Sequence, residues 1–162
     1  MNRPARAFHP EQPRHQGSIA LSKTGAAPPF VGIVVVSHSR RLAEGVVELA
    51  RQMAGDDVAL EAVGGAPDGS LGTDADGIAA AIGRADRGAG VVIVADLGSA
   101  ILASKTAIEL LDKPVTGRVV ISGGPVAEGG LVGAVQASIG EPLAAVLAAT
   151  EEARTLDKGV AR

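Results

Sequence analysis

The chain has 162 residues, no cysteine, an aromatic content of only 1% and a formal net charge of −3 at pH 7. This length suits one ordinary α/β domain, the lack of cysteine excludes disulfides and thiolate metal sites, and the scarcity of aromatic rings argues against a base-stacking surface. Residues 1–29 carry four basic side chains against one acidic side chain, so the rest of the chain is acidic and poorly suited to binding nucleic acid.

The N-terminal segment, residues 1–29, is rich in Pro, Arg, Gln and Gly. This composition is typical of a disordered extension, and the segment lacks the unbroken apolar stretch of a secretory signal. No apolar run in the chain reaches the roughly 18 residues of a membrane span. The sequence therefore predicts a disordered tail and one folded domain over residues 30–162, in a cytoplasmic protein that does not cross a membrane.

The first predicted element is a strand over residues 31–36, a run of β-branched residues typical of a strand that is covered on both faces. After the turn 37–39, a helix is predicted over residues 41–53, because apolar residues recur there at helical spacing. These residues are Leu42, Val46, Leu49, Ala50 and Met53. A second, weaker strand is predicted over residues 58–63, followed by a Gly/Pro/Asp/Ser-rich loop over residues 64–72.

The second half of the chain continues the alternation of helices and strands. The expected elements are a helix from Thr73 or Asp74 to about residue 85, a strand over 91–95, a helix over 100–111 that Pro114 stops, a strand over 119–121, a helix over 129–138, and a last helix that begins near Pro142 and ends near residue 152.

This alternation predicts a parallel sheet with right-handed crossovers. The expected fold is α/β, a doubly wound, mainly parallel sheet with the flavodoxin-like strand order 2-1-3-4 and flanking helices. Ligands of such sheets bind beyond the carboxyl ends of the strands, where the strand order reverses. For this order the reversal lies between the first and third strands, whose exit loops are residues 37–39 and 96–99.

The two exit loops contain the predicted catalytic pair, His38 and Asp96. His38 is the only histidine in residues 30–162, and a neutral imidazole is a competent nucleophile toward phosphorus near pH 7. Such a nucleophile needs its other ring nitrogen held by an acceptor, and Asp96 is placed to be that acceptor. Two alternatives stay open at this point: His38 is only a polar turn residue, and Asp96 is the N-cap of the next helix, alone or in addition to orienting the ring.

Phosphoryl transfer depends mainly on positioning and on charge stabilisation, which backbone N–H groups at helix starts supply. The candidate phosphate-binding residues are Ser39, Gly98, Ser99 and Thr73, with the Ser37 hydroxyl and the Arg40 amide as further candidates. The chain has no P-loop and no GxGxxG after a strand, and a single histidine with scattered acids does not make a metal site. We therefore expect neither a cofactor nor a metal.

Four stretches of the sequence resemble the mannose-type enzyme IIA family of the bacterial phosphotransferase system. They are GIVVVSHS over residues 32–39, DGSLGT over 68–73, ADLGSAI over 95–101 and PVAEGGLV over 125–132. Within that family the stretches are most similar to the phosphotransferase subunits of phosphoenolpyruvate-dependent dihydroxyacetone kinase. The resemblance covers about residues 31–140, nearly the whole predicted domain.

The resemblance implies a function for this domain. His38 would accept a phosphoryl group from the phosphocarrier protein HPr, Asp96 would orient the ring, and the phosphoryl group would then pass to ADP on the nucleotide-binding subunit of the kinase. The resemblance also implies a homodimer. Two alternatives remain: a regulatory module whose binding depends on phosphohistidine without relay to ADP, and a small-ligand-binding domain in which the histidine is structural.

Overall fold

The centre of the protein is a four-stranded parallel sheet, seen in a computed structural model that describes residues 29–160. The strands are β1 (Gly32–Ser37), β2 (Leu60–Gly64), β3 (Val91–Ala95) and β4 (Val119–Ser122). Their order is β2-β1-β3-β4 and every neighbouring pair is parallel. The predicted doubly wound sheet is therefore confirmed, whereas the predicted disordered tail, apart from Pro29, lies outside the described residues.

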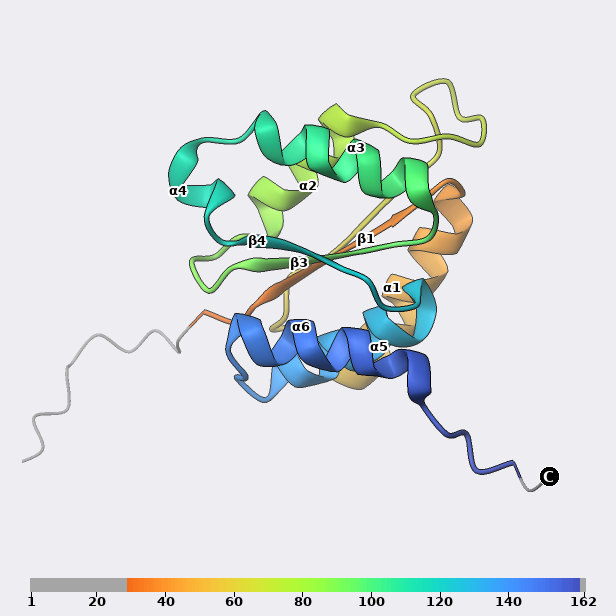
Figure 1. Ribbon diagram of the computed structural model, residues 1–162, viewed down its shortest axis with the longest axis vertical. Coiled ribbons are helices and arrows are strands. Elements are labelled where there is room, and N and C mark those ends of the chain that lie inside the picture. The colour runs from red at the N-terminus through yellow and green to blue at the C-terminus, as the bar shows by residue number, and fades with distance from the viewer. Residues whose placement is uncertain (1–28, 161–162) are drawn as a thin grey trace, which may run out of the picture.

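Helices cover both faces of this sheet (Figure 1). One face carries α2 (Ala75–Ala85), α3 (Gly98–Glu109) and α4 (Lys113–Thr116), and the other carries α1 (Arg40–Ala54), α5 (Val126–Ser138) and α6 (Leu143–Glu152), which ends in a 3-10 turn over Ala153–Thr155. Among the residues that the structure describes, no helix is both long and apolar enough to span a bilayer.

The central strands are buried on both faces, which explains their unbroken β-branched sequences. Side chains alternate along a strand, so Ile33 and Val35 pack with the α1 and α5 layer while Val34 and Val36 pack with the α2 and α3 layer. All six residues of β1 are buried. A strand without a solvent face has no need of polar alternation.

The buried face of α1 differs from the apolar spacing seen in the sequence. The buried residues are Ala43, Val46, Val47 and Ala50, whereas Leu42, Leu49 and Met53 are 43%, 54% and 63% exposed. Small side chains face inward because α5 approaches closely: a Cβ atom at Gly130 would lie 2.9 Å from Cγ1 of Val46.

Three element boundaries also differ from the prediction. Pro114 does not end a long helix but lies in the first turn of the short helix α4, a position at which proline loses no helical hydrogen bond. Helix α3 begins at Gly98 and α5 at Val126, both earlier than expected. The helix α5 was expected to begin only at about Gly129. In the structure Gly129 and Gly130 lie inside the helix and are buried against Thr150 and Val46.

The contact between α5 and α6 leads to a test of this close packing. A Cβ atom at Gly133 would overlap Cγ2 of Thr150, and Thr150 is buried and donates a 2.7 Å hydrogen bond to Oγ of Ser122. We expect Gly133→Ala to lower the free energy of unfolding by about 1–3 kcal/mol, because an overpacked core must shift its neighbours.

The matched control is Gly45→Ala in the exposed part of α1, where a Cβ atom meets nothing within 4 Å. Alanine favours a helix over glycine by about 0.5–1 kcal/mol, so this change should raise the stability. Urea unfolding followed by far-UV circular dichroism measures both variants. Equal stability of Gly133→Ala and wild type would contradict the packing argument.

Candidate functional site

The site forms where β1 and β3 end side by side (Figure 1). In the parallel register Val36 pairs with Ala95, and the N–H of Asp96 donates a 3.2 Å hydrogen bond to the carbonyl of Val36. His38, which follows β1, and Asp96, which follows β3, therefore leave the sheet at the same place. This is the strand reversal point at which the sequence placed the site.

His38 and Asp96 are in direct contact. Nδ1 of His38 lies 2.9 Å from Oδ1 of Asp96, and the backbone N–H of His38 donates a 2.9 Å hydrogen bond to Oδ2. An ionised carboxylate only accepts hydrogen bonds, so Nδ1 carries the proton and Nε2 holds the free lone pair. The side chain of His38 is 26% exposed and that of Asp96 is 12% exposed. The accessible nucleophile of the pair is therefore Nε2.

Nε2 lies at the start of helix α3. It is 2.5 Å from Oγ of Ser99, which donates the hydrogen bond because Nε2 is an acceptor in this tautomer. Ser99 is the second residue of α3. The first N–H groups of a helix have no partner within the helix, so the amides of Gly98 and Ser99 and the helix dipole favour an anion beside Nε2.

The carboxylate of Asp96 accepts four hydrogen bonds. Besides the two bonds from His38, Oδ2 accepts one from the Ser37 hydroxyl at 2.8 Å and Oδ1 accepts one from the N–H of Leu97 at 2.7 Å. Partial burial acts to raise the pKa of Asp96, but the hydrogen bonds from His38, Ser37 and Leu97 outweigh it and hold the pKa below its usual range. Asp96 is thus kept ionised beside the imidazole.

The alternative reading of Asp96 as an N-cap is wrong. The N-cap of α3 is Leu97, and no side-chain hydrogen bond caps that helix. Asp96 lies one residue earlier, where its carboxylate turns toward the end of β1 instead of toward the second or third amide of α3. Three of the four hydrogen bonds that reach it come from Ser37 and His38 at the end of β1, 58 or 59 positions away in sequence, which local capping patterns do not reveal.

Two of the candidate phosphate donors already have hydrogen-bond partners near the start of α1. Ser37 is fully buried, and its hydroxyl accepts a 3.0 Å hydrogen bond from the N–H of Ser39 while it donates to Asp96. The Ser39 hydroxyl accepts a 3.4 Å hydrogen bond from the N–H of Leu42 and caps α1. The expected role of the Ser37 hydroxyl as a phosphate donor is therefore wrong. The sequence signal for its burial was the unbroken apolar run that it ends.

The loop over residues 64–72 is attached to the site through its backbone. The N–H of Gly72 donates a 3.1 Å hydrogen bond to the carbonyl of His38, and the N–H of Gly65 donates a 3.3 Å hydrogen bond to the carbonyl of Ser37. Thr73 follows directly and is half-buried, but within residues 29–160 no hydrogen bond joins it to His38. The phosphate-binding role of Thr73 stays a prediction.

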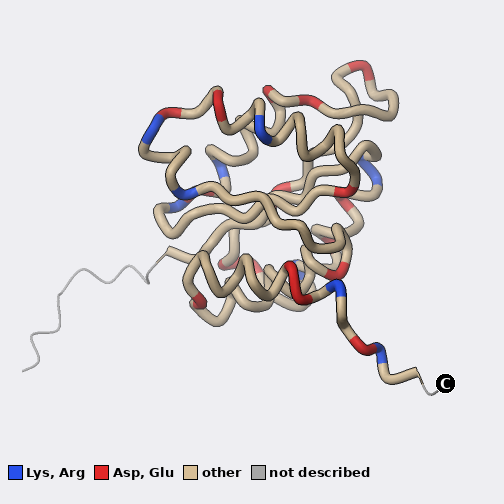
Figure 2. Tube along the Cα trace, viewed as in Figure 1, with Lys and Arg blue, Asp and Glu red and all other residues tan. Residues whose placement is uncertain are grey.

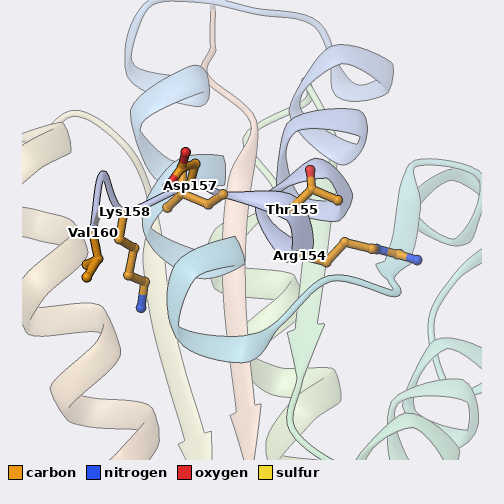
Figure 3. Close-up of a pocket in the computed structure, with 6 residues that line it drawn as sticks. Arg154, Thr155, Asp157, Lys158 and Val160 are labelled. Atoms are coloured by element: carbon orange, nitrogen blue, oxygen red, sulfur yellow. The ribbon is translucent and has the colours of Figure 1, made fainter. Parts of the chain in front are cut away.

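Two hollows of the described surface lie away from His38. One of about 680 Å³ is lined by residues 154–160 alone (Figure 3), and one of about 220 Å³ lies between α1, β2 and α2, with Arg40, Gly64 and Asp74 among its lining residues. Neither includes His38. Within residues 29–160, no group of three or more His, Asp or Glu side chains is arranged to hold a metal, and acidic and basic residues are interspersed over both helical layers (Figure 2).

Comparison with known proteins shows what this chain is similar to. The family model EIIA-man, described as PTS system fructose IIA component, matches residues 32–147. The phosphoryl donor subunit DhaM of PEP-dependent dihydroxyacetone kinase 2 from Listeria innocua is 39% identical over 118 residues, which cover 73% of this chain and 94% of that protein.

Two further relatives differ in length and in what is known of them. The phosphoryl donor subunit DhaM of the PEP-dependent dihydroxyacetone kinase of Escherichia coli K12 is 39% identical over 121 residues, and the match covers 73% of this chain but 26% of that protein. The chain thus spans about a quarter of this longer relative. The crystal structure of EF1359, a protein of unknown function, aligns with a TM-score of 0.72 and 33% identity over 82% of this chain and 99% of that chain.

The hydrogen bonds to Asp96 predict how stability depends on pH. We expect Asp96→Asn to lower the free energy of unfolding at pH 7 by about 1–3 kcal/mol, because an amide cannot accept from all four donors. The native pKa of Asp96 lies below that of the unfolded chain, so the carboxylate stabilises the fold fully above the unfolded pKa. This contribution is lost as the pH falls through the native pKa.

The difference in stability between wild type and Asp96→Asn should therefore shrink as the pH is lowered from 7 into the acid range. Urea unfolding followed by circular dichroism measures it, since the chain has neither Trp nor Tyr. Asp56→Asn, which changes an exposed carboxylate with no hydrogen bond to its side chain among the described residues, is the control. A difference that stays constant at all pH values would contradict the role of the ionised carboxylate.

Proposed function

This chain belongs to the EIIA-man family, and from that membership we propose that it is the phosphoryl donor subunit of a phosphoenolpyruvate-dependent dihydroxyacetone kinase. Relatives that carry this name cover 73% of the chain at 39% identity. The observation that carries the proposal is the imidazole of His38, whose Nδ1 is held by Asp96 while Nε2 faces the N-terminus of α3. This is the geometry that a transient phosphohistidine requires.

In the first step His38 accepts a phosphoryl group from a phosphohistidine on an HPr-type carrier protein. Nε2 attacks the phosphorus, and a new N–P bond forms as the N–P bond of the donor breaks. The electron pair of the broken bond returns to the donor's ring nitrogen. Nδ1 keeps its proton, and the carboxylate of Asp96, 2.9 Å away, stabilises the positive charge that develops on the ring.

The start of α3 stabilises the phosphoryl group. The Ser99 hydroxyl, which donates to Nε2 in the resting state, turns to donate to a phosphoryl oxygen once the nitrogen is occupied. The first-turn amides of Gly98 and Ser99 face the same anion. Ser39 and Thr73 are the other two residues predicted to bind phosphate. The N–H of Ser39 is already bonded to Ser37, but its hydroxyl only accepts a hydrogen bond from Leu42 and keeps its proton free to donate.

In the second step the phosphoryl group passes to ADP held by the nucleotide-binding subunit of the kinase. A terminal oxygen of ADP attacks the phosphorus, a P–O bond forms, the N–P bond breaks, and Nε2 recovers its electron pair. His38 is therefore restored in each cycle, and dihydroxyacetone itself is bound elsewhere in the kinase. We propose that the subunit works as a cytoplasmic homodimer.

The first test of this proposal concerns the site of phosphorylation. Incubation with phosphoenolpyruvate, enzyme I and HPr should add one phosphoryl group that is lost in acid, and His38→Ala should abolish it because Nε2 is gone. Intact-mass spectrometry at neutral pH measures the adduct. The control, His9→Ala with His15→Ala, removes the histidines outside the described residues and should leave the adduct intact. An adduct that survives in His38→Ala refutes the assignment.

The second test separates relay to ADP from a regulatory role. The purified phosphorylated protein, mixed with the nucleotide-binding subunit and ADP, should lose its phosphohistidine and form an equal amount of ATP. Phosphorus-31 NMR follows both signals. A regulatory module would instead bind a partner and keep its phosphoryl group until hydrolysis. Persistence of the phosphohistidine in the presence of subunit and ADP would therefore reject the relay.

A further inference from the structure

Ser37 differs from the other buried polar residues of the domain. Within residues 29–160 these are Ser37, Ser104, Ser122 and Thr150. Ser104 donates to a carbonyl of its own helix at 2.7 Å, and Ser122 accepts from Thr150. The hydroxyl of Ser37 instead donates to a carboxylate, that of Asp96, at 2.8 Å.

The direction of this hydrogen bond is fixed by a second neighbour. The N–H of Ser39 donates to Oγ of Ser37 at 3.0 Å, so one lone pair of the hydroxyl is occupied and its proton turns toward Asp96. A hydroxyl has a single proton to donate. The start of α1 therefore sets the orientation of the Ser37 hydroxyl, and that hydroxyl meets Oδ2 of Asp96.

The two carboxylate oxygens of Asp96 accept hydrogen bonds from different donors. Oδ1 faces Nδ1 of His38 and the N–H of Leu97, while Oδ2 faces the Ser37 hydroxyl and the backbone N–H of His38. The terminal torsion of an aspartate side chain has a broad, soft minimum, so the donors on Oδ2 act together with the N–H of Leu97 to set where Oδ1 points. Without the Ser37 hydroxyl, a single N–H remains to hold Oδ2.

We propose that Ser37 is a positioning residue for phosphoryl transfer, because it holds the Asp96 carboxylate so that Oδ1 receives the Nδ1 proton of His38. Ser37 touches neither the phosphoryl group nor the reacting nitrogen and acts through Asp96. Its effect is on the tautomer: with Oδ1 aligned, the proton stays on Nδ1 and Nε2 is free to attack. This inference rests on the proposed function of His38 and adds a residue to its machinery.

The test compares Ser37→Ala with Ser104→Ala, which removes an equally buried hydroxyl that is bonded to the Ala100 carbonyl of its own helix and not to Asp96. The rate of phosphorylation by phosphorylated HPr, in a single turnover, should fall roughly tenfold or more in Ser37→Ala, the scale of a hydrogen bond to a charged group. Ser104→Ala should keep the wild-type rate, and Ser37→Thr, which keeps the hydroxyl, should retain most of it.

A purely structural role would not alter the tautomer of His38. Nitrogen-15 NMR of the unphosphorylated ring should show the proton mainly on Nδ1 in wild type and a larger share on Nε2 in Ser37→Ala. This measurement needs no donor or acceptor protein, so it tests Ser37 even if HPr fails to phosphorylate His38. Unchanged ring shifts in Ser37→Ala overturn the inference, as does an equal loss of rate in Ser104→Ala.

A double-mutant cycle tests whether Ser37 acts through Asp96. In an Asp96→Asn background, Ser37→Ala should have little further effect on the rate, because the group that it positions is already replaced. Independent, multiplicative losses would overturn the proposed route. If Ser37→Ala does not fold, Ser37→Cys nearly preserves the volume with a weaker donor and should show the same change of tautomer and rate.

Discussion

The hydrogen bond between Nδ1 of His38 and Oδ1 of Asp96 is the contact on which the site depends. It decides which ring nitrogen is free, and it places a negative charge where positive charge develops during transfer. The bond exists because β1 and β3 are neighbours in a parallel sheet, in register at Val36 and Ala95. A shift of one residue in that register would turn one of the two side chains to the other face of the sheet.

The scaffold beneath this contact is almost completely buried. Both central strands are buried on both faces, and the glycines of α5 let α1 and α6 approach closely. The end of β4 is joined to α6 by a buried hydrogen bond between the hydroxyls of Ser122 and Thr150. Among residues 29–160, the hydrogen bonds to the Asp96 carboxylate come from Ser37, His38 and Leu97, and three of the four come from the end of β1.

Much of the fold was predictable because the positions of its strands and helices depend on local sequence patterns. Runs of β-branched residues alternate with apolar residues at helical spacing, and that alternation leads to parallel strands joined by right-handed crossovers. The predictions that were wrong concern residues whose surroundings in the fold differ from what the local sequence pattern indicates. Leu42, Leu49 and Met53 have the spacing of a buried face, yet they are exposed, and the face of α1 that packs inward carries smaller side chains close to Gly130 of α5. Pro114 starts α4 instead of ending α3, since proline suits either position.

The sequence by itself determined the alternation of strands and helices and the two loops in which His38 and Asp96 occur, since hydrophobic periodicity suffices for both. The strand order was an expectation from the flavodoxin-like fold class, and the pairing of the strands in the structure confirms it. The tertiary structure decided how the side chains in those loops are used. It showed Ser37 buried beneath the carboxylate, Leu97 in place of Asp96 as the cap of α3, and Ser99 against Nε2. The contacts of Ser37 with Asp96 and of Ser99 with His38 join residues about sixty positions apart. No local pattern encodes which donors meet a carboxylate once strands from distant parts of the chain have paired.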